Sequence, residues 1–359
     1  MVSERFRAAP RGNLRRGSFL RRLNRFVVEA ESEGRTVLAH LPNPGRLWEI
    51  LFPGTELALL STPRSPKLAC KAVAARRNGH WVCLDTIRAN ALARHLLERE
   101  AVPGLEGWKV RSSEVTAGSS RFDFLLGQGR GQLFLEVKSC TLFQGPMAMF
   151  PDAVTERGRR HLLELAALGE TGARGAVLLI SQGPESRFFL PDYHTDPAFA
   201  RAFLEVRGKV DCFAVSVGWE EDLSLASGVR PLEIPWDVLE RTDFDAGAWL
   251  LVLEGRENPP DLPFSVAVGA EEPGLDRKMK SLAREYGASA VKVLPVRGYR
   301  DGAALLEQAL VPSADDWERR TGPNGGGLLR FSRNPLSVPA FVETLLDFRL
   351  VLQPLGKMP

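Results

Sequence analysis

The chain has 359 residues, enough for about two or three domains, with 44% apolar and 25% charged residues and a formal net charge of +3. These values are typical of a soluble globular protein and exclude a largely disordered chain. No apolar run approaches the roughly 20 residues of a membrane-spanning helix, and the Arg-rich N-terminus lacks the apolar stretch of a secretory signal. The four cysteines form no CxxC pair, so we expect a cytoplasmic protein with reduced thiols and no membrane partner.

The small net charge hides an uneven distribution. Residues 1–28 contain eight arginines and a single acid, Glu4. Residues 1–235 carry 32 basic and 26 acidic side chains, whereas residues 236–359 carry 15 and 18. The excess of basic residues over positions 1–235 suits a polyanionic partner such as nucleic acid, although a solvated basic arm explains the same charge.

The first part of the chain has the pattern of a small barrel. Residues 1–17 are expected to be a flexible basic arm, and residues 18–86 alternate short strands with turn clusters such as Pro42–Gly45. The expected strands are Arg25–Glu29, Arg35–Leu41, Glu56–Leu60, Leu68–Arg76 and His80–Leu84. Five short strands indicate an OB-like β-barrel, although other small barrels fit the pattern equally well.

Residues 87–235 have the pattern of a mixed α/β domain. Helices are expected at 89–100, 153–168 and 197–207, and strands at 111–117, 122–126, 132–137, 176–180 and 210–217, with a loop around Gly145-Pro146. This order of helices and strands predicts an α/β layer domain that ends near Pro231–Pro235. Residues 236–359 are expected to form an additional small α/β domain, with strands at 249–254 and 265–268, helices at 275–286 and 338–349, and a Gly-rich loop at 321–327.

The strongest chemical signal lies on two neighbouring strands of the second domain. Glu136 and Lys138 are two residues apart on one strand and therefore project to the same side. If the preceding strand brings Asp123 alongside, two carboxylates and one ammonium group share a patch. Carboxylates can hold Mg²⁺ or Mn²⁺ while leaving positions for water and phosphate, as metal-assisted phosphodiester hydrolysis requires. A solvated strand face gives the same spacing, but these charges continue the apolar run Leu133–Leu135, where unused charge is costly.

A second signal is the helix that follows. Arg157 and His161 are near neighbours at helical spacing, so this helix is a candidate for phosphate contacts. An ordinary surface helix with i,i+4 pairs such as Glu156–Arg160 is the alternative. The chain contains no Gly-x-Ser-x-Gly elbow, P-loop or Rossmann fingerprint, and we therefore expect no organic cofactor.

At these residues the sequence resembles the sugar fermentation stimulation protein family. The matching blocks are RRLNRF (21–26), AHLPNPGRLWEILFPG (39–54), EVTAGSSRFDFLL (114–126), LEVKSCTL (135–142) and FPDAVTERGRRHLLEL (150–165). The resemblance covers about two-thirds of the chain, to about residue 235. It implies an N-terminal OB-like domain, a PD-(D/E)xK-type restriction-endonuclease-like domain, DNA binding, and a proposed nuclease activity on DNA or RNA.

The resemblance also implies roles for individual residues. Asp123 is the expected aspartate of the nuclease motif, and Glu136 and Lys138 supply its E-x-K, with the two carboxylates as metal ligands. Glu114 either adds a carboxylate or forms an ion pair with Arg121 or Lys138. Arg121 is alternatively a phosphate contact.

The family's NPGR turn contains Arg46, which either reaches a phosphate or braces the interface between domains.

The segment after residue 235 departs from the family. GAWLLVLE (247–254) and LLRFSRNPLSVPAFVETLLDFR (328–349) faintly resemble a small GIY-YIG-like nuclease relative. The tyrosine-rich strand pair of such a domain is missing near Trp249, so we expect a degenerate or structural appendage.

Two functions compete. The first is a magnesium-dependent nuclease that binds DNA or RNA through the backbone, with the barrel holding single strands. Candidate stacking residues in the barrel are Phe26, Trp48, Phe52 and Trp81, some of which must be core. The second is a DNA-binding protein that does not read sequence and does not cleave, with a regulatory role in sugar metabolism suggested by the family name.

Overall fold

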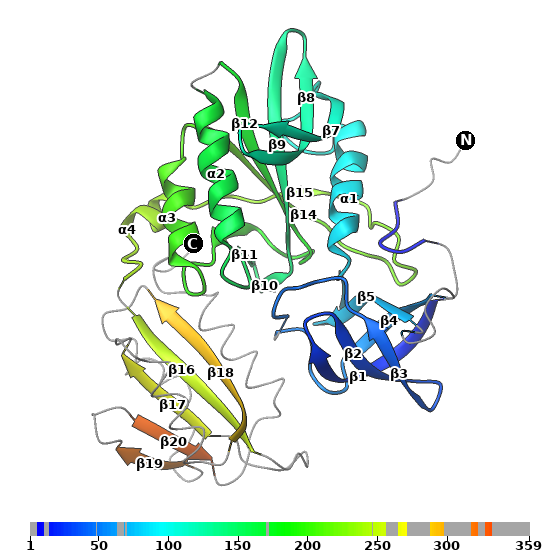
Figure 1. The fold of residues 1–359 in the computed structure, drawn as a ribbon, viewed down its shortest axis with the longest axis vertical. Coiled ribbons are helices and arrows are strands. Elements are labelled where there is room, and N and C mark those ends of the chain that lie inside the picture. The colour runs from blue at the N-terminus through cyan, green and yellow to red at the C-terminus, as the bar shows by residue number, and fades with distance from the viewer. Residues whose placement is uncertain are drawn as a thin grey trace. The chain divides into compact units, whose positions relative to one another are not determined.

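The structure is a computed structural model that describes residues 6–10, 14–47, 49–62, 68, 70–169, 172–245, 247–255, 265–270, 288–297, 317–321 and 327–331. The chain divides into two compact units, Met1–Asp192 with Ala198–Trp236, and Tyr193–Pro197 with Asp237–Pro359. Figure 1 labels the elements of both units. Within the described residues, no helix is long and apolar enough to span a membrane.

The first unit begins with a closed five-stranded barrel. Its strands are β1 (Leu14–Asn24), β2 (Val27–Ser32), β3 (Arg35–His40), β4 (Glu56–Ser61) and β5 (Cys70–Arg77), and β6 (His80–Cys83) extends β5 as a hairpin. The order around the barrel is β1-β2-β3-β5-β4, closed by a parallel pairing of β3 with β5 and an antiparallel pairing of β1 with β4. The OB-type barrel that the sequence predicts is confirmed, but the five predicted strands correspond to β2–β6, and the 11-residue strand β1 was missed.

The barrel closes because β1 changes partner half-way along its length. β1 pairs with β4 from Leu14 to Ser18 and with β2 from Ser18 onward. At Gly17 an added Cβ would meet Leu59 Cδ1 at 2.7 Å and Glu31 O at 2.9 Å. A glycine is therefore required where two neighbouring strands converge on β1.

The expected flexible arm over residues 1–17 needs correction, because β1 already starts at Leu14. The earlier segment 6–10 is also held: Ala8 N donates to Leu223 O at 2.8 Å, and Leu225 N donates to Phe6 O at 2.7 Å. Ala8 and Ala9 are buried. These partners lie more than 200 residues away in the sequence. The composition of segment 6–10 therefore suggests a flexible arm, although contacts with distant residues hold the segment in place.

A mixed six-stranded sheet forms the second half of the first unit. Its elements are α1 (Thr86–Glu98), β7 (Lys109–Ala117), β8 (Ser120–Gln128), β9 (Gly131–Cys140), α2 (Glu156–Leu168), β12 (Arg174–Ser181), α3 (Pro197–Glu205), β14 (Val210–Ser216) and β15 (Arg230–Pro231). The strand order is β15-β14-β12-β9-β8-β7, with β9, β12 and β14 parallel and β7, β8 and β9 an antiparallel meander. We refer to this half as the nuclease-like domain.

The two long helices cover opposite faces of this sheet (Figure 1). Leu133, Leu135 and Val137 of β9 share one core with the buried α1 residues, including Leu92 and Leu96. Alternate β9 residues, Glu136 among them, point to the α2 side, as strand geometry requires. The side chains of one strand therefore serve a core on one face and a polar site on the other.

Several elements were absent from the sequence prediction. The expected loop around Gly145-Pro146 is a hairpin of β10 (Leu142–Gln144) and β11 (Met147–Phe150), and β13 (Phe188–Pro191) pairs with β11 in parallel. α4 (Trp236–Arg241) was also missed. These strands have three or four residues each, too few for a period-2 pattern to stand out, and their long-range pairing forms the small sheet.

The second unit contains a five-stranded antiparallel sheet. Its strands are β16 (Gly247–Gly255), β17 (Ser265–Ala270), β18 (Ala288–Arg297), β19 (Trp317–Thr321) and β20 (Gly327–Phe331), in the order β18-β16-β17-β20-β19. The expected helices at 275–286 and 338–349 lie outside the described residues, as does most of the Gly-rich loop. The degenerate GIY-YIG-like assignment stays a prediction.

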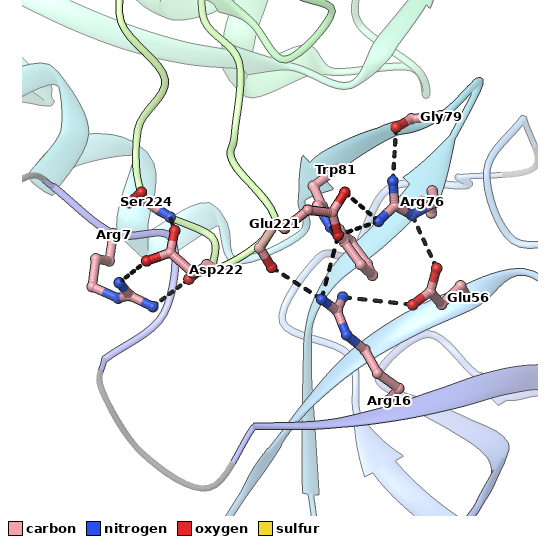
Figure 2. Close-up of polar contacts among 9 residues, drawn as sticks. All are labelled: Arg7, Arg16, Glu56, Arg76, Gly79, Trp81, Glu221, Asp222 and Ser224. Carbon is pink, nitrogen blue, oxygen red and sulfur yellow. Dashed lines mark hydrogen bonds and ion pairs between the residues drawn. The ribbon is translucent and has the colours of Figure 1, made fainter.

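A charged cluster joins the barrel to the nuclease-like domain (Figure 2). The Glu221 carboxylate accepts hydrogen bonds from Arg76 at 2.6 and 2.7 Å and from Trp81 Nε1 at 3.2 Å. The guanidinium carbons of Arg16 and Arg76 lie 4.2 and 4.5 Å from the centre of the Trp81 ring. Single exposed ion pairs contribute little to stability, whereas a shared carboxylate backed by an aromatic ring fixes geometry as well.

The barrel loop 42–47 makes a second connection between the two halves. Arg22 Nη1 donates to the carbonyls of Gly45 and Arg46, both at 2.7 Å, and Thr86 of α1 donates to Pro42 O at 3.0 Å. The Asp152 carboxylate accepts hydrogen bonds from the backbone amides of Arg46 and Leu47. The loop is thus held by the barrel through the Gly45 and Arg46 carbonyls, and by the nuclease-like domain through the Pro42 carbonyl and two backbone amides.

We expect Gly45→Ala to destabilise the protein by about 1–3 kcal/mol, because a Cβ there overpacks the loop. That Cβ would lie 2.1 Å from Asp152 Oδ2 and 2.9 Å from Asn43 Oδ1. Urea unfolding measures the effect. The matched control is Gly169→Ala, where nothing lies within 4 Å of an added Cβ and φ is −57°. Equal midpoints for the two variants would contradict the packing argument.

We expect Asp222→Asn to weaken stability at neutral pH and to matter less in acid. Hydrogen bonds from Ser224 and the Arg7 guanidinium hold the pKa of Asp222 well below its usual range. A lowered folded-state pKa gives stability that is present above the unfolded value, near 4, and that is lost as the pH falls below it. The difference between the urea midpoints of wild type and variant should therefore be smaller at about pH 3 than at about pH 7. A constant gap would show that Asp222 does not act through its charge.

Candidate active site

Asp123 lies where two paired strands separate. The pairing of β8 with β9 ends at Phe124↔Leu135. Beyond it, the Val137 backbone amide donates to Asp123 Oδ2 at 2.7 Å, so a side chain takes the place of a strand carbonyl. Asn90 Nδ2 of α1 donates to Asp123 Oδ1 at 2.6 Å. Both carboxylate oxygens are therefore fixed at the edge where the strands part.

Glu136 directly precedes Val137 on β9 and is almost completely buried, at 4% exposure. Its Oε1 accepts from Lys138 Nζ at 2.5 Å and lies 2.6 Å from His161 Nδ1. Its Oε2 is buried and has no hydrogen-bond partner among the described residues. A buried carboxylate oxygen without a partner is costly, so Oε2 is a candidate ligand for a cation.

The electrostatics of the two carboxyl groups are opposite. Burial, and then the charge of Glu136, raise the pKa of Asp123, against the hydrogen bonds from Val137 and Asn90. Burial alone would raise the pKa of Glu136, but the hydrogen bond with His161 and the charge of Lys138 lower it below the usual value. A bound cation would favour the ionised form of both groups.

The donor set suits one hard divalent cation that keeps part of its hydration shell. Among the described residues, no group of three or more His, Cys, Asp and Glu side chains gathers at one point. Mg²⁺ typically binds through one or two carboxylates, with the other positions left to water and substrate phosphates. Asp123 and Glu136 fit that requirement.

His161 has a different role from the expected phosphate contact, because it is only 2% exposed. Arg157 Nε donates to its Nε2 at 3.3 Å, which assigns the ring proton to Nδ1 and makes Nδ1 the donor to Glu136. The Phe122 ring packs edge-on against it at 5.8 Å. His161 therefore orients Glu136 and cannot reach a nucleic acid, whereas Arg157 is exposed.

Comparison with known proteins places this site in a family. Residues 20–84 match the model of the SfsA N-terminal OB domain, and residues 87–222 match that of the sugar fermentation stimulation protein RE domain. A sugar fermentation stimulation protein homologue of Moorella thermoacetica is 43% identical over 196 residues, which cover 54% of this chain and 84% of the relative. The chain belongs to the sugar fermentation stimulation protein family. A homologue from Chloroflexus aurantiacus is 37% identical over 228 residues, covering 60% of this chain and 88% of that relative.

A solved member of this family has the same architecture. The structure of Pyrococcus furiosus SfsA in complex with Ca²⁺ is similar at a TM-score of 0.58 and 28% identity, covering 64% of this chain and 99% of that chain. The OB barrel and the restriction-endonuclease-like domain predicted from the sequence are confirmed. The family models end at residue 222, so residues 237–359 of the second unit lie beyond the matched region.

The structure separates the remaining predicted site residues from the carboxylates. Glu114 is exposed and pairs with Arg121, with 2.9 Å between Oε2 and Nε, and not with Lys138. Arg46 is exposed in loop 42–47. Asn90 was missed, because its only sequence signal is an amide on an otherwise apolar helix face, and its contact with Asp123 depends on how α1 packs.

We expect His161→Ala to cost about 2–4 kcal/mol of stability, because it removes a buried ring and a partner of Glu136. The matched variant Arg157→Ala should cost under about 1 kcal/mol, since that side chain is exposed. Urea unfolding of both proteins tests the difference. Equal losses would show that the ring does not support the buried carboxylate.

Proposed function

We propose that this protein is a divalent-metal-dependent nuclease that hydrolyses phosphodiester bonds of DNA or RNA. The observation that carries the proposal is the buried, unpartnered Glu136 Oε2 beside Lys138, in the patch that also holds Asp123. The restriction-endonuclease-like domain, the Ca²⁺ bound by the Pyrococcus furiosus relative and the basic first 235 residues all support it.

Asp123 and Glu136 are the proposed ligands of Mg²⁺ or Mn²⁺. When bound, the metal polarises the phosphate and lowers the pKa of its water. Hydrolysis forms one phosphorus–oxygen bond to a water molecule and breaks another, and the departing oxygen takes up a proton.

The chain itself supplies positioning and charge. Lys138 Nζ lies within 2.5 Å of Glu136 Oε1, where its ammonium group can hold the attacking water and offset the charge that develops on phosphate. Asn90 and the Val137 amide keep Asp123 in place, and His161 keeps Glu136 in place. The exposed guanidinium groups of Arg46 and Arg157 are the proposed phosphate contacts. Arg121 is a further proposed contact, although its guanidinium group already forms an ion pair with Glu114.

We expect Mg²⁺-dependent cleavage of labelled DNA or RNA that falls by about 100-fold or more in Glu136→Gln and Lys138→Ala. Arg130→Ala is the matched control, because Arg130 is an exposed residue in the turn between β8 and β9, at the opposite end of those strands from Asp123. Binding, measured on the same proteins at about 0.1 M salt, should survive all three changes. If the wild-type protein binds nucleic acid but does not cleave it in Mg²⁺ or Mn²⁺, the nuclease proposal is rejected and a nucleic-acid-binding function remains.

A further inference from the structure

Exposed apolar side chains gather around loop 42–47. In the part of the chain that the structure describes, the large exposed apolar residues are Leu23, Phe26, Leu38, Ile87 and Val154. Three of them flank this loop. Phe26 O accepts from Leu41 N at 2.8 Å, Ile87 follows the Thr86 that contacts Pro42, and Val154 lies two residues after Asp152. Large apolar side chains exposed at one place mark a binding surface more often than a structural need.

Two of these exposed apolar residues lie near the groups that hold Asp123 and Glu136. Ile87, 76% exposed, lies one helical turn before Asn90, which holds Asp123. Val154, 64% exposed, lies three residues before Arg157, which contacts the His161 that holds Glu136. A ligand that covers these side chains therefore lies next to the groups that position both proposed metal ligands.

The arginines of this surface are not neutralised. Arg25, Arg46 and Arg157 are exposed, and none forms an ion pair with a carboxylate among the described residues. By contrast, Arg7, Arg16, Arg21 and Arg76 of the same basic region are all paired. Unpaired guanidinium groups beside exposed apolar side chains suit a partner that is both anionic and aromatic.

The structure also decides which barrel aromatic residue is available. Trp81 and Phe52 are buried, at 1% and 9% exposure, and Trp48 lies outside the described residues. Phe26 is 47% exposed, in the turn between β1 and β2, and its backbone amide is fixed by Asn24 Oδ1 at 2.9 Å. The Arg25 guanidinium carbon lies 5.7 Å from its ring centre. The first loop of an OB barrel is a common place for oligonucleotide contacts.

We propose that the nucleic acid bound here is unpaired: a single strand stacks a base on Phe26, places phosphates on Arg25 and Arg46, and runs past Ile87 and Val154 to the carboxylates. This rests on the proposed function and names its substrate class. A duplex hides the faces of its bases and presents phosphates and groove edges, so it offers no base face on which an exposed aromatic ring can stack. An unpaired strand offers both a stacking face and a backbone charge.

The surface is pre-formed, which favours binding without a rearrangement. Arg22 ties the two barrel turns together, because Nη1 donates to the Gly45 and Arg46 carbonyls and Nη2 donates to Arg25 O at 2.8 Å. Asp152 holds the amides on the other side of loop 42–47. Phe26 and Arg46 are therefore fixed in one rigid assembly.

The test is binding of a labelled mixed-sequence oligonucleotide of about 16 nucleotides, single-stranded or as the duplex, in DNA and in RNA, without divalent metal. Phe26→Ala and Phe26→Leu should weaken single-strand binding about tenfold, and Phe26→Trp should retain it, because stacking needs an aromatic ring. Duplex binding should not change in any of the three variants. The matched control Arg130→Ala should leave single-strand binding unchanged.

Two results would overturn the proposal: Phe26→Leu binding single strands as well as wild type, or Phe26→Ala weakening single strands and duplex equally. Because Phe26 is half exposed, unchanged urea midpoints should confirm that the variants fold. The outcome is separable from the proposed nuclease function, because binding is measured without divalent metal. Wild type that binds single strands through Phe26 but does not cleave rejects only the nuclease, whereas either of the two results above, together with cleavage, rejects only the single-strand surface.

Discussion

The arrangement of the candidate site depends on one backbone amide that bonds to a side chain and not to a neighbouring strand. Where β8 and β9 part, the Val137 amide finds its acceptor in the Asp123 carboxylate and not in a neighbouring strand. A buried amide must be paired, so this bond fixes the carboxylate as firmly as a ladder bond fixes a strand. Glu136 follows the last β9 residue paired with β8, and its second carboxylate oxygen has no partner among the described residues. Asn90, Lys138 and His161 then serve to hold two acidic groups close together.

Charge has two separate uses in the barrel. Arginines that meet a carboxylate connect parts of the chain: Arg16 and Arg76 meet Glu221, and Arg7 meets Asp222 (Figure 2). Arginines without a carboxylate, at positions 25 and 46, remain on the surface around loop 42–47. The number of basic residues in the sequence therefore includes arginines paired within the fold and arginines left unpaired at its surface, and only the structure tells them apart.

The hydrophobic pattern was sufficient for much of the fold. Strands β2–β6 and the order of α1, β7, β8, β9, α2 and β12 follow from alternation and helical periodicity, which are local properties, whereas β1 was missed. The small sheet of β10, β11 and β13 was not foreseeable, because its short strands are stabilised only by distant partners. The same reason applies to segment 6–10, whose composition resembles an arm although residues beyond 220 hold it.

The sequence by itself determined the family and the two folds of the first unit, because each depends on order and spacing along the chain. It also predicted Asp123, Glu136 and Lys138 as site residues, on the same kind of pattern. Only the tertiary structure decided what their neighbours do. His161 is a buried support of Glu136, Glu114 is an exposed partner of Arg121, and Phe26, unlike Trp81 and Phe52, faces solvent. Burial and partner choice are set by segments far apart in the sequence, and no local pattern contains that information.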